Sequence, residues 1–471
     1  MTNLYWKLFK VCCIIFSMRK TALYILGIIL FLCNSAQAFE IVYPKSNNTI
    51  IDSPVTAFIG NEKVTKNLTI NGQCIKLHST GAFKYPVNLN FGKNTFLIDN
   101  GIEKKVYTIT RNQYIQSNYS QNTKPIFYGD QKIIITTDNK TVLRSTPVDK
   151  GLNRLQHLQS GIELEAVGEY KNFYKVILGR DNIAWVDKSQ VKISDKKQLQ
   201  EGLVRNLEYN ADKIEETFII NTEGVRLPYI LSETTNGLDL IIYNINSAIN
   251  PYGVYEFSIA HDGNLSGYSS AYNDKNELVI KVNKTHKKLK DLKITIDAGH
   301  GGREYGATGC LGHKEKDINL KIAQKLKTLL QARGANVIVT RMDDRDVSLN
   351  DSIKTANDNN SEIFISIHAN ALPDSLLDKN IRGTEVYYFY PQAKKLAKSI
   401  LNSIVKGTGT KDNGVKGESF AVVRNTNAVS ILVEIGYIID PEDNALLINN
   451  EFQDDVAKAI VTGLENYLNE L

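Results

Sequence analysis

Short runs in which apolar and polar residues alternate fill the chain from residue 39 to about residue 283. Examples lie at 55–59, 95–98, 174–176, 238–243 and 277–282. Alternation with a period of two is typical of strands with one buried face, and glycine- or asparagine-containing turns separate the runs. Changes in composition divide them into three β-rich regions, at 39–115, 126–197 and 203–283. The regular strand spacing of the first region predicts a small sandwich.

The pattern changes class at residue 292. Continuously apolar runs, for example at 294–296, 363–367 and 431–433, now alternate with segments of helical period. Continuously apolar strands separated by amphipathic helices are typical of an α/β domain with a mainly parallel sheet, which we predict for 292–471. In such sheets, functional sites lie beyond the carboxyl ends of the strands. The expected protein is therefore multidomain, with β-rich modules followed by an α/β catalytic domain.

The first 38 residues have the pattern of an export signal. A basic segment at 18–20 precedes an apolar stretch at 21–33, and Ala36-Gln37-Ala38 supplies a small-x-small cleavage pattern. We expect a signal peptide at 1–38, with Met18 as a possible true start. The mature protein is then exported to the periplasm or cell wall, without a stable membrane anchor because the apolar stretch is too short to span a bilayer comfortably.

Charge and cysteine content narrow the class of partner. The formal charge of the chain is +5, and its first 38 residues carry four cations and no acidic residue, so the mature chain has a charge of +1. A nearly neutral chain has no electrostatic footprint for nucleic acid, and we expect no such partner.

Cys74 and Cys310 remain after export. They are expected as two separate thiols, with a disulfide as the alternative.

Four residues stand out as candidate chemistry: His300, Glu315, His368 and Glu434. Each lies at the end of a strand-like run or in the loop beyond it. Two imidazoles and a carboxylate suit a zinc ion with one open position, and a further carboxylate can move protons. Three of the four also have a structural alternative. His300 could shape its glycine-rich loop, His368 could be a core residue, and Glu315 could favour a helix dipole. Together, the four favour a metal site.

The motifs around these residues carry a family resemblance. They are Asp297-x-Gly-His-Gly-Gly302, Gly309-x-x-Gly-x-x-Glu-Lys-Asp317, Phe364-Ile-Ser-Ile-His-Ala-Asn370 and Leu432-Val-Glu-x-Gly-Tyr-Ile438. In this order and spacing, residues 293–471 resemble the zinc-dependent N-acetylmuramoyl-L-alanine amidases, the cell-wall amidases of the amidase-3 type. Ser352 departs from the family pattern, since its helix usually carries arginine there.

The resemblance implies a role for each motif residue. His300, Glu315 and His368 would bind one Zn²⁺, and Glu434 would be the catalytic carboxylate. Arg424 and Asn370 would contact substrate. The implied function is a peptidoglycan hydrolase that cleaves the amide between N-acetylmuramic acid and L-alanine with zinc-activated water. Two alternatives stay open: a zinc peptidase that cuts within the stem peptide, and a non-catalytic wall-binding protein.

The regions before the α/β domain resemble known modules less closely. Residues 39–115 resemble bacterial immunoglobulin-like modules, 126–197 resemble a bacterial SH3-like barrel, and 203–283 match no fold that we can assign. Trp185 is predicted as the core anchor of the barrel, with contact to peptidoglycan as the alternative. The lysine-rich stretch at 284–290 is predicted as a solvated hinge rather than a contact for an anionic polymer.

The connection between the second histidine motif and the next strand bears on regulation. Some amidases of this family carry a long helical insertion there, which blocks the zinc until a partner removes it. Here the connection runs only from Ala369 to Thr384, too short for a substantial helix and its two returns. We therefore expect peptidoglycan as the partner and no obligatory activator protein.

Overall fold

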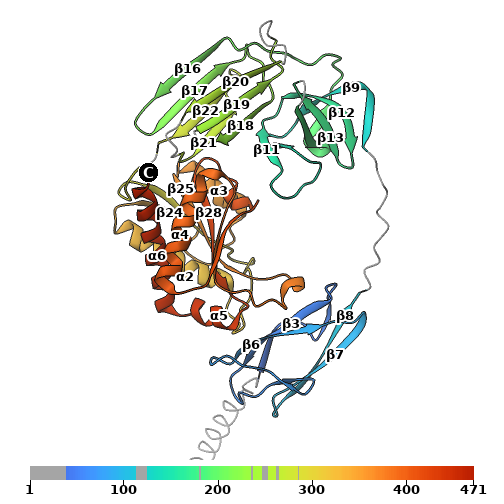
Figure 1. The fold of residues 1–471 in the computed structure, drawn as a ribbon, viewed down its shortest axis with the longest axis vertical. Helices are drawn as coiled ribbons and strands as arrows, with labels where there is room; N and C mark the ends of the chain where they lie inside the picture. Colours follow the sequence, from blue (N-terminus) through green and yellow to red (C-terminus); the bar gives the residue numbers. More distant parts are fainter. Residues whose placement is uncertain are drawn as a thin grey trace, which may run out of the picture. The chain divides into compact units, whose positions relative to one another are not determined.

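The structure is a computed structural model that describes residues 39–112, 125–179, 182–234, 237–246, 253–260, 265–284 and 286–471 (Figure 1). The predicted signal peptide lies outside these residues, as does nearly all of the polar stretch at 116–125, which separates the first two predicted β-rich regions. The chain forms two compact units: Met1–Gln113 with Asp374–Asp378, and Tyr114–Pro373 with Lys379–Leu471. Among the described residues, no helix is long and apolar enough to cross a membrane.

The first unit contains two sheets that share a core. Sheet orders are β1-β3-β6 and β2-β8-β7-β4-β5. The strands are β1 (Phe39–Tyr43), β2 (Asn48–Ile50), β3 (Val55–Glu62), β4 (Thr69–Ile70), β5 (Gln73–Cys74), β6 (Ala82–Asn88), β7 (Gly92–Asp99) and β8 (Lys104–Arg111). Phe58 and Phe83 of one sheet and Phe96, Ile98 and Ile109 of the other lie in one buried cluster. Two sheets that bury their inner faces against each other make a sandwich. Its immunoglobulin-like character stays a prediction.

The second unit begins with one seven-stranded sheet, of order β11-β10-β14-β13-β12-β9-β15. Its elements are β9 (Ile126–Thr136), β10 (Thr141–Arg144), β11 (Arg154–Leu158), β12 (Glu163–Tyr170), β13 (Phe173–Leu178), β14 (Asn182–Asp187), η1 (Lys188–Gln190) and β15 (Val191–Ile193). The core-anchor prediction for Trp185 is wrong. Ala184 and Val186 are fully buried, whereas Trp185 between them is half-buried and outside the core cluster. Successive side chains of a strand point to opposite faces, so Trp185 points away from the core.

Two further sheets follow, of order β16-β17-β22-β21 and β18-β19-β20. Their strands are β16 (Asn206–Ala211), β17 (Glu215–Asn221), β18 (Tyr229–Thr234), β19 (Gly237–Tyr243), β20 (Val254–Ala260), β21 (Tyr268–Tyr272) and β22 (Leu278–Asn283). One hydrophobic cluster joins this region to the seven-stranded sheet. It includes Leu143 and Val176 from that sheet and Tyr229, Leu240 and Ile280 from this region. The two strand-rich regions therefore share a core.

The α/β region forms a six-stranded sheet of order β24-β23-β25-β28-β26-β27. Its strands are β23 (Lys293–Ala298), β24 (Asn336–Val339), β25 (Ile363–Asn370), β26 (Thr384–Tyr388), β27 (Asp412–Gly417) and β28 (Val429–Tyr437). Strands β24, β23, β25 and β28 pair in parallel, whereas β26 pairs antiparallel to β28 and parallel to β27. The sheet is thus mainly parallel, as predicted, but its last two strands run in the opposite direction.

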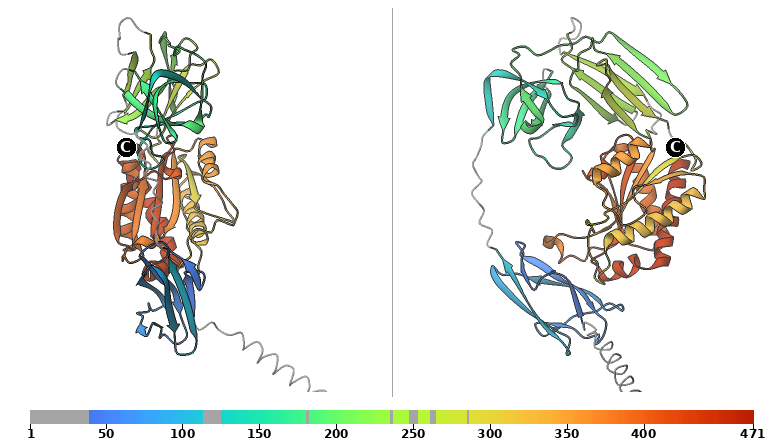
Figure 2. Two further views of the ribbon diagram at one scale, coloured as in Figure 1. Left: turned by 90° about the vertical axis from the view of Figure 1, so that its right-hand side faces the viewer. Right: turned by 180° about the vertical axis from the view of Figure 1, so that it is seen from behind.

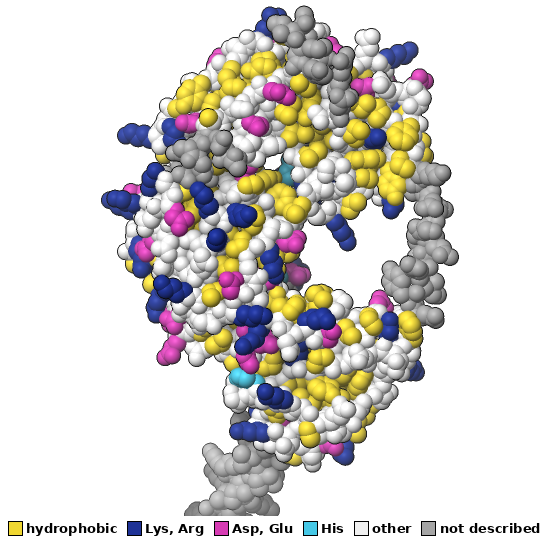
Figure 3. Space-filling view, in the orientation of Figure 1, with side chains coloured by type: hydrophobic (Ala, Val, Ile, Leu, Met, Phe, Trp, Pro, Cys, Tyr) yellow, Lys and Arg dark blue, Asp and Glu magenta, His cyan; other side chains and the backbone are white. Residues whose placement is uncertain are grey.

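Helices flank this sheet (Figures 1 and 2). They are α2 (Glu315–Gln331), α3 (Leu349–Asp358), α4 (Lys394–Thr408), α5 (Pro441–Leu447) and α6 (Asn450–Asn469), with single turns η3 (Pro391–Ala393) and η4 (Ala421–Val423). The single turn η2 (Asp374–Leu376), in the connection from β25 to β26, belongs to the first compact unit. Helix α6 packs against both α2 and α4. The stripe formed by Ile318, Ile322 and Leu326 of α2 is buried, which is the helical period seen in the sequence. On the face drawn in Figure 3, basic and acidic side chains are interspersed.

In the segment between the strand-rich region and β23, Lys287, Lys288 and Lys290 are exposed, as predicted, but the segment is held to the sheet and is not a free hinge. Leu289 is buried, and the Nδ1 atom of His286 lies 2.8 Å from a carboxylate oxygen of Glu362. The strand-rich region also bonds to the α/β region directly. The backbone N–H of Tyr268 donates to the Thr426 carbonyl oxygen at 2.7 Å, and that of Gln392 donates to Glu233 at 2.7 Å.

Candidate metal centre

His300 lies in the loop directly after β23, at the carboxyl end of the parallel strands. Its backbone has a φ of +63°, in the left-handed region that few non-glycine residues adopt. This turn lies close to β25, the neighbouring strand that carries His368, because a Cβ atom on Gly299 would stand 2.1 Å from the Nε2 atom of His368. Glycine at position 299 therefore leaves the space that the His368 ring occupies.

Glu315 is the first residue of α2 and is buried. Its Oε2 atom accepts a hydrogen bond from the backbone N–H of Ala307 at 2.8 Å, which fixes the carboxylate. A Cβ atom on Gly306 would lie 2.4 Å from the same oxygen. The loop before α2 therefore needs glycine at 306 to approach the carboxylate. This loop and the helix start together aim Glu315 at the two histidines.

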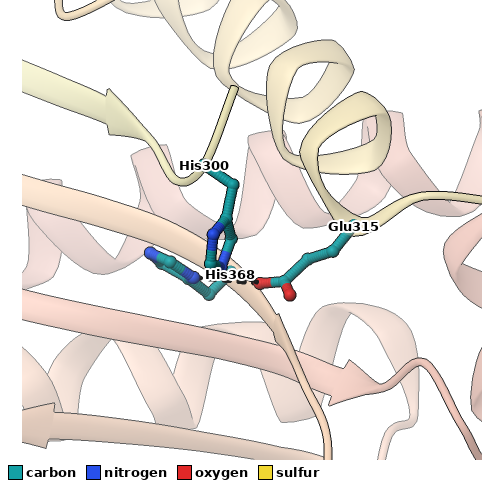
Figure 4. Close-up of side chains that lie close together, drawn as sticks. All are labelled: His300, Glu315 and His368. Carbon is teal, nitrogen blue, oxygen red and sulfur yellow. Dashed lines mark hydrogen bonds and ion pairs between the residues drawn. The ribbon is translucent and has the colours of Figure 1, made fainter. Parts of the chain in front are cut away.

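His368 lies on β25 and completes the group (Figure 4). Its Nδ1 atom is 2.9 Å from the Oε1 atom of Glu315, and the Nε2 atom of His300 is 3.3 Å from that oxygen. One potential ligand atom from each of the three residues lies within 4.8 Å of the others. The structure therefore brings together the three residues predicted as metal ligands, from a loop, a helix start and a strand.

The electrostatics of the group follow from these contacts. Burial alone would raise the pKa of Glu315, but its hydrogen bonds to His300 and His368 hold that pKa well below its ordinary value. Burial alone would lower the pKa of His368, yet the bond to Glu315 and the charge of Glu434 raise it to about 9. The Glu315 carboxylate thus favours a positive charge beside it, which is what a bound metal ion would supply.

Glu434 lies on β28 directly opposite His368 in the parallel pairing of β25 with β28. Its Oε2 atom is buried and has no hydrogen-bond partner among the described residues. Burial raises the pKa of this carboxyl to about 8, with His368 opposing the rise and Glu315 and Glu385 adding to it. A buried carboxyl group without a partner is costly to fold, and such groups cluster at functional sites.

Two buried polar residues behind the group were not singled out from the sequence. Asn319 donates from Nδ2 to the Gly299 carbonyl oxygen at 3.1 Å, which connects α2 to the His300 loop. It lies one helical turn after Glu315, so the i, i+4 spacing could have indicated it. Asp297 accepts hydrogen bonds from the hydroxyls of Thr340, Ser352 and Ser366 at 2.7–2.8 Å. Ser352 thus has a defined partner here, although the family usually has arginine at this position.

The two predicted substrate contacts lie in different places. Asn370 follows His368 by two residues and donates from Nδ2 to Glu385 at 2.6 Å. The structure does not bring Arg424 to the group. It directly follows η4, before the amino end of β28, and it donates to the Ser419 carbonyl oxygen, whereas Glu434 lies toward the carboxyl end of β28. A contact between Arg424 and substrate stays a prediction.

Comparisons with known proteins place this geometry in a family. The profile of a family described as N-acetylmuramoyl-L-alanine amidase matches residues 294–466. The chain is 34% identical over 215 residues to a Staphylococcus saprophyticus protein named probable cell wall amidase LytH, covering 45% of this chain and 70% of that protein. The chain belongs to the N-acetylmuramoyl-L-alanine amidase family. All four residues of the candidate site lie within the range that the amidase profile matches.

Two further relatives of this amidase extend the comparison. A Bacillus subtilis protein with the name uncharacterized protein YqiI is 35% identical over 186 residues, covering 39% of this chain and 87% of that protein. Among solved structures, the N-acetylmuramoyl-L-alanine amidase AmiC2 of Nostoc punctiforme is 35% identical with a TM-score of 0.36, covering 39% of this chain and 99% of that chain.

Proposed function

We propose that this amidase is a zinc-dependent peptidoglycan hydrolase that cleaves the amide between N-acetylmuramic acid and L-alanine of the stem peptide. The observation that carries this proposal is the convergence of His300, Glu315 and His368 beside Glu434, a carboxyl group without a partner among the described residues. Family membership gives the reaction class, and the LytH relative bears the name of a cell wall amidase.

The donor set fits zinc. Two imidazoles and one carboxylate are a common set for catalytic zinc, which keeps a fourth position open. At bond lengths of about 2.0–2.1 Å, ligand atoms around a tetrahedral zinc lie roughly 3.3 Å apart. Glu315 Oε1 lies 3.3 Å from His300 Nε2 and 2.9 Å from His368 Nδ1, which is close to this spacing. When bound, zinc would polarise the scissile carbonyl group and lower the pKa of a water molecule.

Glu434 would move the proton in this reaction. An amide has a poor leaving group, so its cleavage needs a base that becomes an acid. Glu434 takes a proton from the attacking water and then donates it to the amide nitrogen as the C–N bond breaks. Its pKa, which burial raises to about 8, lies near neutral pH, as expected for a group that takes up a proton and then releases it.

Mass spectrometry of purified sacculi digested by the exported protein tests this function. We expect products in which the lactyl group of N-acetylmuramic acid ends in a free carboxylate and the stem peptide begins with a free L-alanine amine. Cleavage between two amino acids would instead make the protein a stem peptidase. The absence of any product would leave a wall-binding protein.

Location and control follow from the same proposal. The signal-like leader supports export to the periplasm or cell wall. The connection from β25 to β26 contains only the single turn η2 as regular structure, so it has no inserted helix to cover the metal site, which supports activity without an activator protein. Rates on a small soluble muropeptide test this point. An increase of tenfold or more when wall-associated proteins are added would contradict constitutive activity.

A further inference from the structure

A second carboxylate lies beside Glu434 on the sheet. In the antiparallel pairing of β26 with β28, Glu385 is directly opposite Glu434, and in the pairing of β25 with β28, His368 is opposite Glu434. Directly opposite residues on neighbouring strands point to the same face of a sheet. His368, Glu434 and Glu385 therefore form one row, with a candidate metal ligand at one end and Glu385 at the other.

Glu385 is fully buried and accepts hydrogen bonds from four side chains. Its Oε1 atom accepts from Asn370 Nδ2 at 2.6 Å, from the Tyr387 hydroxyl at 2.6 Å and from the Tyr437 hydroxyl at 3.0 Å. Its Oε2 atom pairs with the Nζ atom of Lys416. Burying a carboxylate is costly unless donors surround it. Donors on both oxygens suit the ionised form, which only accepts.

A β-bulge brings Tyr437 into this network. Between the pairs His368–Glu434 and Asn370–Tyr437, β25 advances two residues while β28 advances three. In a regular strand, a residue three positions after Glu434 would point to the opposite face. The extra residue on β28 turns Tyr437 back toward Glu385, and bulges of this kind often re-aim side chains next to active sites.

Glu385 fixes the hydrogen-bonding direction of the three residues that contact its Oε1 atom. We call Asn370, Tyr387 and Tyr437 the polar wall. Both tyrosine hydroxyls donate their hydrogen to Glu385, so their oxygens remain as acceptors. Asn370 places one amide hydrogen on Glu385, and its Oδ1 atom accepts from the Ala371 N–H at 2.7 Å. One N–H of Asn370 remains to donate.

Of these groups beside Glu434, the remaining N–H of Asn370 and the oxygen of Tyr387 can face a ligand, whereas Tyr437 is buried and supports the wall from behind. Asn370 and Tyr387 are half-buried, so part of the wall is accessible. Peptide backbone presents both C=O and N–H groups, which match such a surface. We propose that Glu385 is a positioning residue that polarises the polar wall, and that the wall binds backbone amides of the stem peptide next to the scissile bond. This inference rests on the proposed function for the class of substrate.

The variant Glu385→Gln tests the role of the charge. A glutamine has one donor and one acceptor end, so either orientation sets a donor against Lys416 or against the polar wall. We expect the KM for an N-acetylmuramoyl pentapeptide to rise about tenfold, as expected for one or two lost hydrogen bonds, with kcat changed less. One zinc per chain should stay bound. An unchanged KM would overturn the proposal.

Two companion measurements separate positioning from a general loss of structure. In the double variant Glu385→Gln/Lys416→Gln, the new amide at position 416 can accept from the amide at position 385. The oxygen at position 385 then accepts from the wall again, so most of the KM increase should disappear. In a double-mutant cycle, Asn370→Ala should remove most of the effect of Glu385→Gln. Full additivity, or no recovery by Lys416→Gln, would mean that Glu385 does not act through the polar wall.

Glu163→Gln is the matched control. Glu163 is also a buried glutamate, 2.5 Å from Lys196, but it lies on β12 in the seven-stranded sheet, so activity should not change. Failure of the proposed function looks different, because the wild-type protein would then release no L-alanine amine from sacculi. Calorimetric titration of the same muropeptide into wild-type and Glu385→Gln proteins still tests Glu385 in that case. Equal affinities would contradict its role.

Discussion

The parallel sheet of the amidase domain carries a histidine–glutamate contact at each end, and the two contacts differ in what else surrounds them. At the amino end, Glu362 accepts hydrogen bonds from the His286 ring at 2.8 Å and from the backbone N–H groups of His286 and Lys293 at 3.1 and 3.2 Å. At the carboxyl end, Glu315 faces two imidazoles, those of His300 and His368.

This difference shows what makes a histidine–glutamate contact a candidate site. Glu362 fastens the segment before β23 to the sheet, because it accepts from the ring and the backbone N–H of His286 in that segment and from the backbone N–H of Lys293 at the start of β23. At the carboxyl end, a second imidazole converges on the carboxylate, and the unpartnered carboxyl of Glu434 lies on the neighbouring strand. Within the described part of the chain, only the carboxyl end combines these features. A single histidine–glutamate pair, as at the amino end, is sufficient for a structural role. Two imidazoles on one carboxylate, beside a carboxyl group without a partner, indicate a catalytic site.

The largest effect is expected for His368→Ala. Loss of one of three protein ligands should remove most of the bound zinc and lower amidase activity by more than about a thousandfold, since the metal supplies the main electrostatic stabilisation. His286→Ala is the matched control at the other end of the sheet and should keep both. Metal analysis and a muropeptide assay give the answer. Full zinc content in His368→Ala would remove His368 from the site.

Glu434→Gln should lower kcat by about 10²–10⁴, the usual contribution of a general acid or base. Zinc should stay bound, because Glu434 is not among the three converging ligands. The same chemical change at the amino end, Glu362→Gln, should leave kcat within about twofold. Loss of metal from Glu434→Gln would assign Glu434 as a ligand and change the roles proposed above.

The order of effects should reverse for stability. Glu362→Ala leaves two backbone N–H groups at the amino end without their acceptor, which costs roughly 1–3 kcal/mol for buried groups. Glu434→Gln breaks no hydrogen bond of its carboxylate within the described residues, so its melting temperature should match that of the wild type. Scanning calorimetry of metal-free proteins compares them. Equal melting temperatures for both variants would contradict the fastening role of Glu362.

The smallest effect concerns pH at the amino end. Glu233 accepts from the Gln392 N–H, with Tyr268 and Tyr390 beside it, and burial raises its pKa to about 7. Between its ordinary pKa and about 7, the folded protein keeps a proton that the unfolded chain has released. Stability therefore falls as pH rises through this window and levels off above it. We expect melting temperature to drop less between pH 5 and pH 8 in Glu233→Gln. Identical dependence of melting temperature on pH in the wild type and in Glu233→Gln would show that Glu233 is not the group responsible.

Much of the candidate site could be predicted because its signals are local. The glycines around His300 and the apolar runs before His368 and Glu434 describe short pieces of backbone, and parallel strands bring their carboxyl ends to one edge. Asn319 could also have been predicted, because it lies one helical turn after Glu315. These features need no knowledge of how distant segments pair.

The remaining features depend on pairing over long distances in the sequence. Glu385 faces Glu434 because β26 runs antiparallel to β28, and apolar runs alone do not give strand direction. His286 and Glu362 are 76 residues apart, so a lysine-rich stretch gave no sign of the contact. For Trp185, residue type favoured burial, but the register of β14 directed Ala184 and Val186 inward instead. In each case, contacts between segments far apart in the sequence determine where the side chain lies.

The hydrophobic cluster shared by the seven-stranded sheet and the strands β16 to β22 has a consequence for how this protein can be assembled from parts. Gene fusion exchanges segments cleanly only where each segment carries its own core. A crossover between residues 197 and 203 would divide one core into two incomplete halves and expose side chains such as Leu143 on one product and Leu240 on the other. We therefore expect that these two regions can be transplanted or deleted only as a single unit.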